Sequence, residues 1–119
     1  MYNIVLKEED MLQEDHFPVI ALINEACNAN LLEFIRNLCE EVGSGYNFTN
    51  CTFWSELDDY DKTSIPKYDG LFVETEDGEE VTISLEIMQK YLKLAVNRIS
   101  PATNREELYS LIESLGKNA

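Results

Sequence analysis

Residues 71–83 read LFVETEDGEEVTI and contain the clearest strand signal in the chain. Two runs rich in apolar and β-branched residues flank the pair Asp77-Gly78. An Asp-Gly pair between such runs indicates a β-hairpin, because a type I′ turn needs a positive φ at both central positions. We therefore predict a hairpin closed by a two-residue turn, in which Glu76 lies directly opposite Glu79.

One more strand is expected before this hairpin. Residues 46–54 are rich in aromatic and β-branched side chains, which favour strands, and Trp54 is expected to belong to the core. Between this strand and the hairpin, residues 56–69 are polar and acidic and include Pro66, so we expect a loop there. Together these segments predict a three-stranded antiparallel sheet from about residue 48 to residue 83.

Apolar residues recur at helical spacing on the N-terminal side of this sheet. One helix is predicted from Pro18, which suits the first helical position because its missing N–H is not needed there. A second helix is predicted after Asn30, with Glu33 at the spacing of a capping box and Gly43 as a left-handed residue that ends it. Before these helices, residues 4–6 have the composition of a short strand.

Two more helices are predicted after the sheet. Ser84 caps the first, which has an apolar stripe at helical spacing and is stopped by Pro101. Thr103, followed by Glu106, opens the second, and Gly116 ends it. The order of elements is two N-terminal helices, a small sheet and two C-terminal helices. This order predicts the α+β class rather than alternating α/β.

The composition limits the classes of partner. The chain has 119 residues, the length of a single domain, and its 23 acidic and 9 basic side chains give a formal net charge of −14. Such an acidic body repels polyanions, so neither nucleic acid nor an anionic membrane surface is expected as a partner. We expect one folded domain, residues 1–119, in the cytoplasm, because the sequence contains no signal-like or membrane-spanning stretch.

The acidic residues are not spread evenly. Residues 56–80 hold ten acids and two bases, whereas residues 81–119 hold four acids and five bases. A solvated surface is the simpler interpretation of such a run. However, the predicted Glu76–Glu79 pair would place like charges opposite each other, which destabilises a hairpin, and a basic partner would relieve that repulsion. We therefore predict that this segment binds a cationic protein, such as a nuclease with a basic, phosphate-binding groove.

No catalytic or metal centre is expected. The only histidine, His16, has no oriented partner, although a pair with Cys51 stays open as the basis of a small enzyme. The three cysteines, Cys27, Cys39 and Cys51, form no C-x-x-C motif and are expected to be reduced thiols. The segment that starts at Asp59 lacks the ligand pattern of a calcium loop, and the sequence has neither a phosphate-binding glycine loop nor zinc-ligand spacing. We therefore expect no cofactor.

Several segments resemble one family of known proteins. They are residues 67–74 (KYDGLFVE), 80–84 (EVTIS), 91–95 (YLKLA) with Arg98, and 38–46 (LCEEVGSGY). They are similar to bacterial immunity proteins of contact-dependent growth inhibition systems, in particular those that neutralise ribonuclease toxins. The N-terminal segment and the last helix fall outside this resemblance. The resemblance implies a single immunity-protein-like domain that binds and neutralises the C-terminal toxin domain of its own delivery system, typically an RNA-cleaving enzyme.

The predicted toxin-binding residues follow from the charge argument alone. Nine are carboxylates, and two are tyrosines expected to act as anchors, because interface hot spots favour tyrosine. They are Glu56, Asp58, Asp59, Tyr60, Asp61, Tyr68, Glu74, Glu76, Asp77, Glu79 and Glu80. The alternative is an acidic nucleic-acid mimic or adaptor that occupies a basic site on a host protein. Such a mimic would need carboxylates spaced regularly along an elongated surface.

Overall fold

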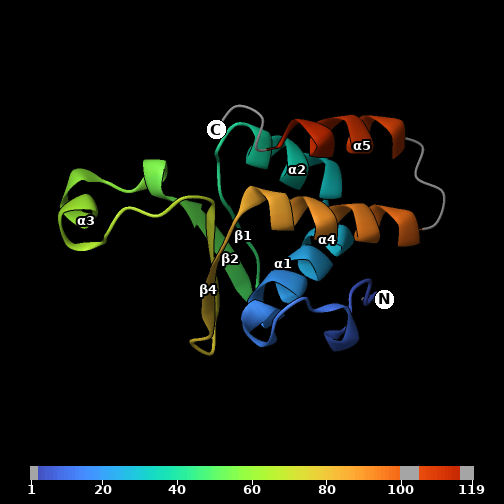
Figure 1. Ribbon diagram of the computed structural model, residues 1–119, viewed down its shortest axis with the longest axis horizontal. Coiled ribbons are helices and arrows are strands. Elements are labelled where there is room, and N and C mark those ends of the chain that lie inside the picture. The colour runs from blue at the N-terminus through green and yellow to red at the C-terminus, as the bar shows by residue number, and fades with distance from the viewer. Residues whose placement is uncertain (1–2, 100–104, 116–119) are drawn as a thin grey trace.

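A four-stranded antiparallel sheet in the order β1-β2-β3-β4 organises the chain (Figure 1). The computed structural model describes residues 3–99 and 105–115. The strands are β1 (Ser44–Gly45), β2 (Thr49–Phe53), β3 (Leu71–Thr75) and β4 (Glu80–Ile83). The α-helices are α1 (Phe17–Ala29), α2 (Leu31–Cys39), α3 (Asp59–Ser64), α4 (Leu85–Arg98) and α5 (Arg105–Ser114). Short 3₁₀ helices are η1 (Glu8–Asp10), η2 (Glu14–His16) and η3 (Trp54–Glu56).

The predicted α+β class is confirmed, but the prediction of three strands and four helices is wrong. The described residues contain a fourth strand, β1, and a fifth α-helix, α3. The strand β1 has two residues and no apolar pattern, and it forms because it pairs with Asn50 and Cys51 of β2. The helix α3 lies in the acidic segment expected to be a loop, where the Asp58 carboxylate caps it by accepting a hydrogen bond from the Asp61 N–H at 2.8 Å.

One face of the sheet forms the core together with the helices. Side chains alternate along each strand, so every second residue points to this face. The buried apolar residues on it are Cys51, Phe53, Leu71, Val73, Val81 and Ile83. The helix α1 lies against β2, β3 and β4, while α5 packs on α2 and α4 (Figure 1). The opposite face is open to solvent at Asn50, Glu80 and Thr82.

The start of α2 is as predicted, but its end is not. The Asn30 side-chain oxygen accepts a hydrogen bond from the Glu33 N–H at 3.0 Å, which confirms the cap. The helix ends at Cys39, and the residue with a positive φ, 57°, is Glu41 rather than Gly43. A glycine is required at position 43 for a different reason, because a Cβ atom there would lie 2.1 Å from a backbone oxygen of β2.

The two C-terminal helices are present as predicted. The Ser84 hydroxyl oxygen accepts a hydrogen bond from the Ile87 N–H at 3.2 Å, which confirms the cap of α4. The apolar stripe of α5 is buried against α2 and α4. The helix stops and the cap predicted at Pro101, Thr103 and Gly116 lie outside the described residues.

The N-terminal segment is not a strand. Its backbone runs beside α1, where the side-chain amide of Asn24 takes the place of a strand partner. The amide oxygen accepts hydrogen bonds from the Val5 and Leu6 N–H groups, each at 2.8 Å. The amide nitrogen donates to the Leu6 carbonyl at 2.9 Å. These bonds hold the Leu6 side chain in the core, where it is 1% exposed.

An ion pair ties this segment to α4. The Arg98 guanidinium donates hydrogen bonds to both carboxylate oxygens of Asp10, at 2.6 and 2.8 Å, and a third to the Val5 carbonyl at 3.0 Å. Because the hydrogen bond from Arg98 favours the ionised form, it lowers the pKa of Asp10 from 3.8 to about 2.

Replacing Asp10 with asparagine should reduce the acid sensitivity of the fold. The depressed folded-state pKa means that the Asp10 carboxylate stabilises the native state above pH 3.8, and that this contribution is lost as the pH falls toward 2. The free energy of unfolding, measured in urea between about pH 5 and pH 2, should fall less steeply in Asp10→Asn than in the wild type. Glu8→Gln, an exposed carboxylate in the same turn, serves as the control. Equal slopes in Asp10→Asn and the wild type would contradict this prediction.

Candidate partner-binding surface

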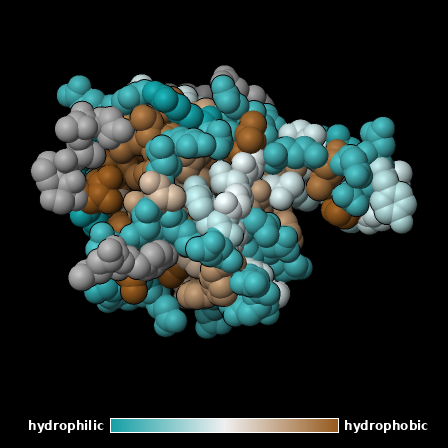
Figure 2. Space-filling model, turned by 180° about the vertical axis from the view of Figure 1, so that it is seen from behind, coloured by the Kyte–Doolittle hydropathy of each residue, from teal (hydrophilic) through white to brown (hydrophobic). Residues whose placement is uncertain are grey.

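The face of the sheet opposite α1 carries the outward side chains of β2, β3 and β4. We call it the open face, and its members are Asn50, Thr52, Phe72, Glu74, Glu80 and Thr82. Residues 54–70, which connect β2 to β3 and include α3, project from the sheet away from the helices, and we call them the arm (Figure 1). Seen from behind, the arm stands out from the body and its surface is mostly hydrophilic (Figure 2).

Two carboxylates face each other on the open face. The strand register places Glu74 between Asn50 of β2 and Glu80 of β4. Neither Glu74 nor Glu80 has a hydrogen-bond or ion-pair partner among the described residues. Like charges directly opposite on neighbouring strands destabilise a sheet. The open face therefore carries a repulsion that no residue within 3–99 and 105–115 relieves.

The predicted pairing of Glu76 with Glu79 is wrong, because the hairpin loop has three residues instead of two. The Thr75 N–H donates to the Glu79 carbonyl at 2.8 Å, so these two residues close the hairpin. Gly78 has a φ of 96°, which fits the left-handed position at the end of a three-residue loop. The like-charge pair that the sequence predicted at the turn therefore occurs within the strands, as Glu74 opposite Glu80.

The tip of the hairpin contributes exposed charge. The Thr75 hydroxyl donates a short hydrogen bond to the Asp77 carboxylate, so Asp77 helps to hold the turn. The carboxylates of Glu76 and Glu79 are exposed and have no partner among the described residues. These two residues are free to meet a cationic group.

Within the arm, the predicted residues have different surroundings. Tyr60, on α3, is 80% exposed, and Asp59 beside it is also exposed. Asp58 caps the helix. Glu56 is exposed, but one of its carboxylate oxygens is occupied, because it accepts hydrogen bonds from the Phe53 and Gly43 N–H groups at 2.8 and 2.9 Å. Of the predicted residues in the arm, Tyr60 and Asp59 are exposed, and their side chains form no hydrogen bond or ion pair with another described residue.

Tyr68 packs against two residues of the open face, Thr52 and Phe72. Its hydroxyl donates to the Thr52 carbonyl at 3.1 Å, and its ring centroid lies 6.1 Å from that of Phe72. Partial burial raises the pKa of Tyr68. The sequence identified Tyr68 but missed Phe72 and Thr52, whose alternation with buried strand residues was the available signal.

The structure does not gather the predicted residues into a single patch. The arm follows Phe53 and precedes Leu71, which pair with each other at one end of the sheet. The hairpin tip follows Thr75 at the other end, and the five residues of β3 separate the two ends by about 13 Å. Glu74 and Glu80 lie directly beside the Thr75–Glu79 pair that closes the hairpin, so the acidic residues form two groups, one in the arm and one at the hairpin end of the sheet.

The structure also answers whether His16 and Cys51 share a site. His16 is buried, with its Nδ1 atom 2.7 Å from the Tyr91 hydroxyl, which in turn accepts a hydrogen bond from the Leu12 N–H at 2.7 Å. The Cys51 sulfur instead accepts a hydrogen bond from the Ser44 N–H at 3.3 Å, and burial raises the pKa of its thiol to about 12. The two side chains therefore have separate partners. No group of three or more potential ligands is placed to hold a metal ion within residues 3–99 and 105–115.

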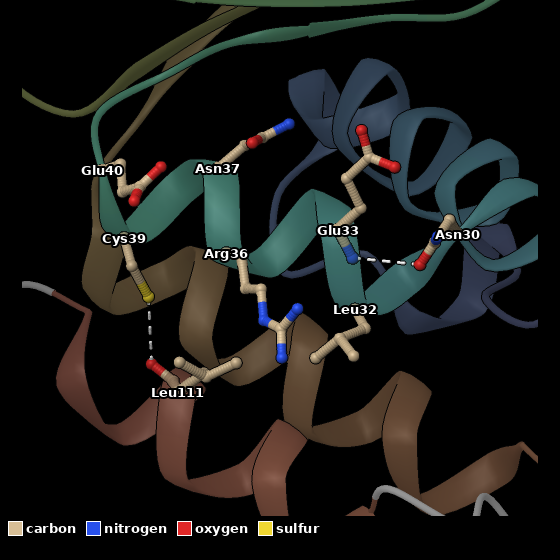
Figure 3. A pocket seen from close by; sticks show the side chains of 8 residues that line it. All are labelled: Asn30, Leu32, Glu33, Arg36, Asn37, Cys39, Glu40 and Leu111. Carbon is tan, nitrogen blue, oxygen red and sulfur yellow. Dashed lines mark hydrogen bonds between the residues drawn. The ribbon is translucent and has the colours of Figure 1, made fainter.

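The helical side of the molecule has a shallow groove between α2 and α5 (Figure 3). An ion pair between Arg36 and Glu107, at 2.5 Å, bridges these helices, and the Cys39 thiol donates to the Leu111 carbonyl at 3.5 Å. None of the predicted toxin-binding residues lines this groove.

No protein-family model matches the chain, and comparison with curated proteins finds no significant match. Across the part of the chain that the structure describes, no helix combines the length and the apolar character needed to cross a membrane.

Proposed function

We propose that this chain is an immunity protein, which binds and neutralises the cognate C-terminal toxin domain of a bacterial contact-dependent growth inhibition system. The toxin domain is expected to be a ribonuclease, because an enzyme that binds RNA has a basic groove. The inhibitor needs no cofactor and no chemistry of its own, and it acts in the cytoplasm, where the toxin would meet RNA.

The observation that carries this proposal is the Glu74–Glu80 pair on the open face. The pair opposes folding, it has no basic partner within the described residues, and its repulsion would fall if a cationic surface covered it. The exposed carboxylates of the hairpin tip and of the arm extend the same negative field, which accelerates association with a basic protein. The sequence resemblance to ribonuclease-toxin immunity proteins supports the same conclusion.

The test is binding to the toxin domain encoded next to the gene for this chain. That domain should bind the purified protein in a one-to-one complex, and co-expression of the protein should protect cells from the toxin. Binding should weaken as salt is raised, because salt screens exposed charges. A toxin domain that neither binds the protein nor is neutralised by it would overturn the proposal.

Replacing Tyr60 with alanine should weaken toxin binding by about tenfold, which is the effect of losing a moderate aromatic anchor. Because this side chain is 80% exposed, the free energy of unfolding should stay within about 0.5 kcal/mol of the wild type. Calorimetric titration and urea unfolding measure the two quantities. Tyr60→Phe keeps the ring and should bind nearly as tightly as the wild type. Unchanged affinity in Tyr60→Ala would remove the arm from the interface.

A further inference from the structure

A second groove, of about 700 Å³, lies between the arm and the helical body. Apolar side chains line part of it, from β2, from the start of α4 and from the ends of α2 and α5. They are Leu38, Phe53 and Leu115, which are only 1–4% exposed, and the half-buried Leu85; the half-buried Tyr68 lines the groove from the arm. The only tryptophan in the chain, Trp54, lines the groove on the arm side. It was expected in the core, but it is only partly buried, because η3 carries it out of the sheet.

The ammonium groups of two lysines lie close to the ring of this tryptophan. The Nζ atoms of Lys62 and Lys67 lie 4.8 and 5.8 Å from the centroid of the Trp54 ring, in the range of cation–π contact. They are the only basic residues in positions 37–89 of a strongly acidic chain. Despite the many carboxylates nearby in sequence, neither forms an ion pair with a described residue.

The ammonium groups of the groove are its available donors. The indole Nε1–H of Trp54 has no hydrogen-bond partner among the described residues, but it is shielded from solvent and so does not face a ligand. Two carboxylates also line the groove: Glu41 accepts a hydrogen bond from the Ser55 hydroxyl at 3.2 Å, and Asp69 lies more than 4 Å from both ammonium groups. Two ammonium groups without an ion-pair partner among the described residues favour a ligand that brings negatively charged oxygen atoms.

We propose that this groove binds an acidic peptide segment in which aliphatic side chains alternate with carboxylates. The carboxylates would pair with Lys62 and Lys67, and the aliphatic side chains would cover the half-buried apolar side chains of the groove, Trp54, Tyr68 and Leu85. A peptide fits the groove better than a small anion does, because half-buried apolar side chains line the groove together with the two lysines and its volume is about 700 Å³. The proposal rests on Lys62, Lys67 and Trp54, none of which belongs to the predicted toxin-binding residues, so it goes beyond the proposed toxin contact and does not depend on it.

The fluorescence of Trp54 reports on the site directly, since no other tryptophan contributes. The probe is the peptide acetyl-Leu-Glu-Leu-Glu-amide, which has no aromatic ring of its own. Titration of the full chain should give a saturable change in emission. The uncharged analogue acetyl-Leu-Gln-Leu-Gln-amide should bind about tenfold more weakly, because it loses the charge-assisted hydrogen bonds. Acetate and inorganic phosphate should bind more weakly than the acidic peptide, because they lack the aliphatic part.

Protein variants locate the site. Lys62→Gln and Lys67→Gln should each weaken peptide binding by about tenfold. Lys90→Gln makes the same change of charge at an exposed position on α4, which does not line the groove, and should leave the affinity within about twofold. Circular dichroism should show that all three variants keep the wild-type fold.

Three results would overturn the proposal. The first is no saturable emission change with the acidic peptide, and the second is equal binding of its uncharged analogue. The third is an equal loss of affinity in Lys90→Gln and the groove variants. Tight binding of phosphate or acetate alone would replace the peptide site with a simple anion site. The two analogue titrations use the wild-type protein and no toxin, so their outcome is independent of the variants and of the proposed function.

Discussion

Replacing Gly43 with alanine is expected to destabilise the fold by about 3 kcal/mol or more, the upper range for overpacking at a site that cannot relax. A Cβ atom at this position would lie 2.1 Å from the Cys51 carbonyl oxygen and 2.9 Å from a carboxylate oxygen of Glu56. The Cys51 carbonyl belongs to β2, which is paired on both sides, so it cannot move without disturbing the sheet. The Gly43 N–H also donates to Glu56 at 2.9 Å, and a shift of the backbone would break that bond.

Gly45 is the matched control for this change. It lies two residues further along, in β1, where the nearest atom to an added Cβ is the Asn50 Cβ at 3.9 Å. Gly45→Ala should therefore be neutral or stabilising by less than about 1 kcal/mol, since alanine restricts the unfolded chain. Urea unfolding followed by Trp54 fluorescence measures both variants. If the two variants have the same stability, close approach to β2 is not the reason for the glycine at position 43.

Reversing the charge of Glu80 should raise stability and lower toxin affinity. Glu80→Lys turns the Glu74–Glu80 repulsion into an attraction across the sheet, worth about 0.5 to 1 kcal/mol in favour of folding. The same change removes a carboxylate from the proposed interface and introduces a positive charge, so toxin binding should weaken by about tenfold. The double variant Glu74→Lys/Glu80→Lys should weaken binding by about a hundredfold or more, because both contacts become repulsive.

The control is the same reversal on the helical side. Glu106 is exposed on α5 and lies away from the open face, so Glu106→Lys should leave toxin affinity within about twofold. The tip variant Glu76→Lys/Glu79→Lys shows how far the contact extends along the sheet. Equal affinity in the wild type and in Glu74→Lys/Glu80→Lys would remove the open face from the interface, whereas a loss in Glu106→Lys of the same size would indicate a non-specific charge effect.

The helices were predictable because their signals are local. The caps at Asn30 and Ser84 are confirmed by single hydrogen bonds within one turn, and the apolar stripes they precede are buried. The elements that the sequence did not predict, β1 and α3, lack an apolar pattern altogether. Strand pairing forms the first, and the Asp58 cap in a solvent-exposed arm supports the second.

The local sequence predicted the position of the hairpin turn but not the length of its loop. Asp77-Gly78 correctly indicated a turn, but a glycine with positive φ suits both two-residue and three-residue loops. The choice between them follows from the strand register, in which Leu71 pairs with Ile83 and Val73 with Val81 so that these apolar side chains face the core. This register is a property of the packed sheet and not of the turn residues.

The acidic segment shows the same division most clearly. Composition and periodicity, which are properties of neighbouring residues, determined the α+β class, the four helices outside the arm and the stretch of chain that carries the excess of acid. Only the tertiary structure decided what each charge does. Glu74 faces Glu80, Glu56 accepts a hydrogen bond from the Gly43 N–H, and the two lysines of the arm lie within cation–π distance of Trp54. The physical reason is that a charged side chain acts over a few ångströms of space, and distant parts of the chain meet at that range only after strands and helices have packed.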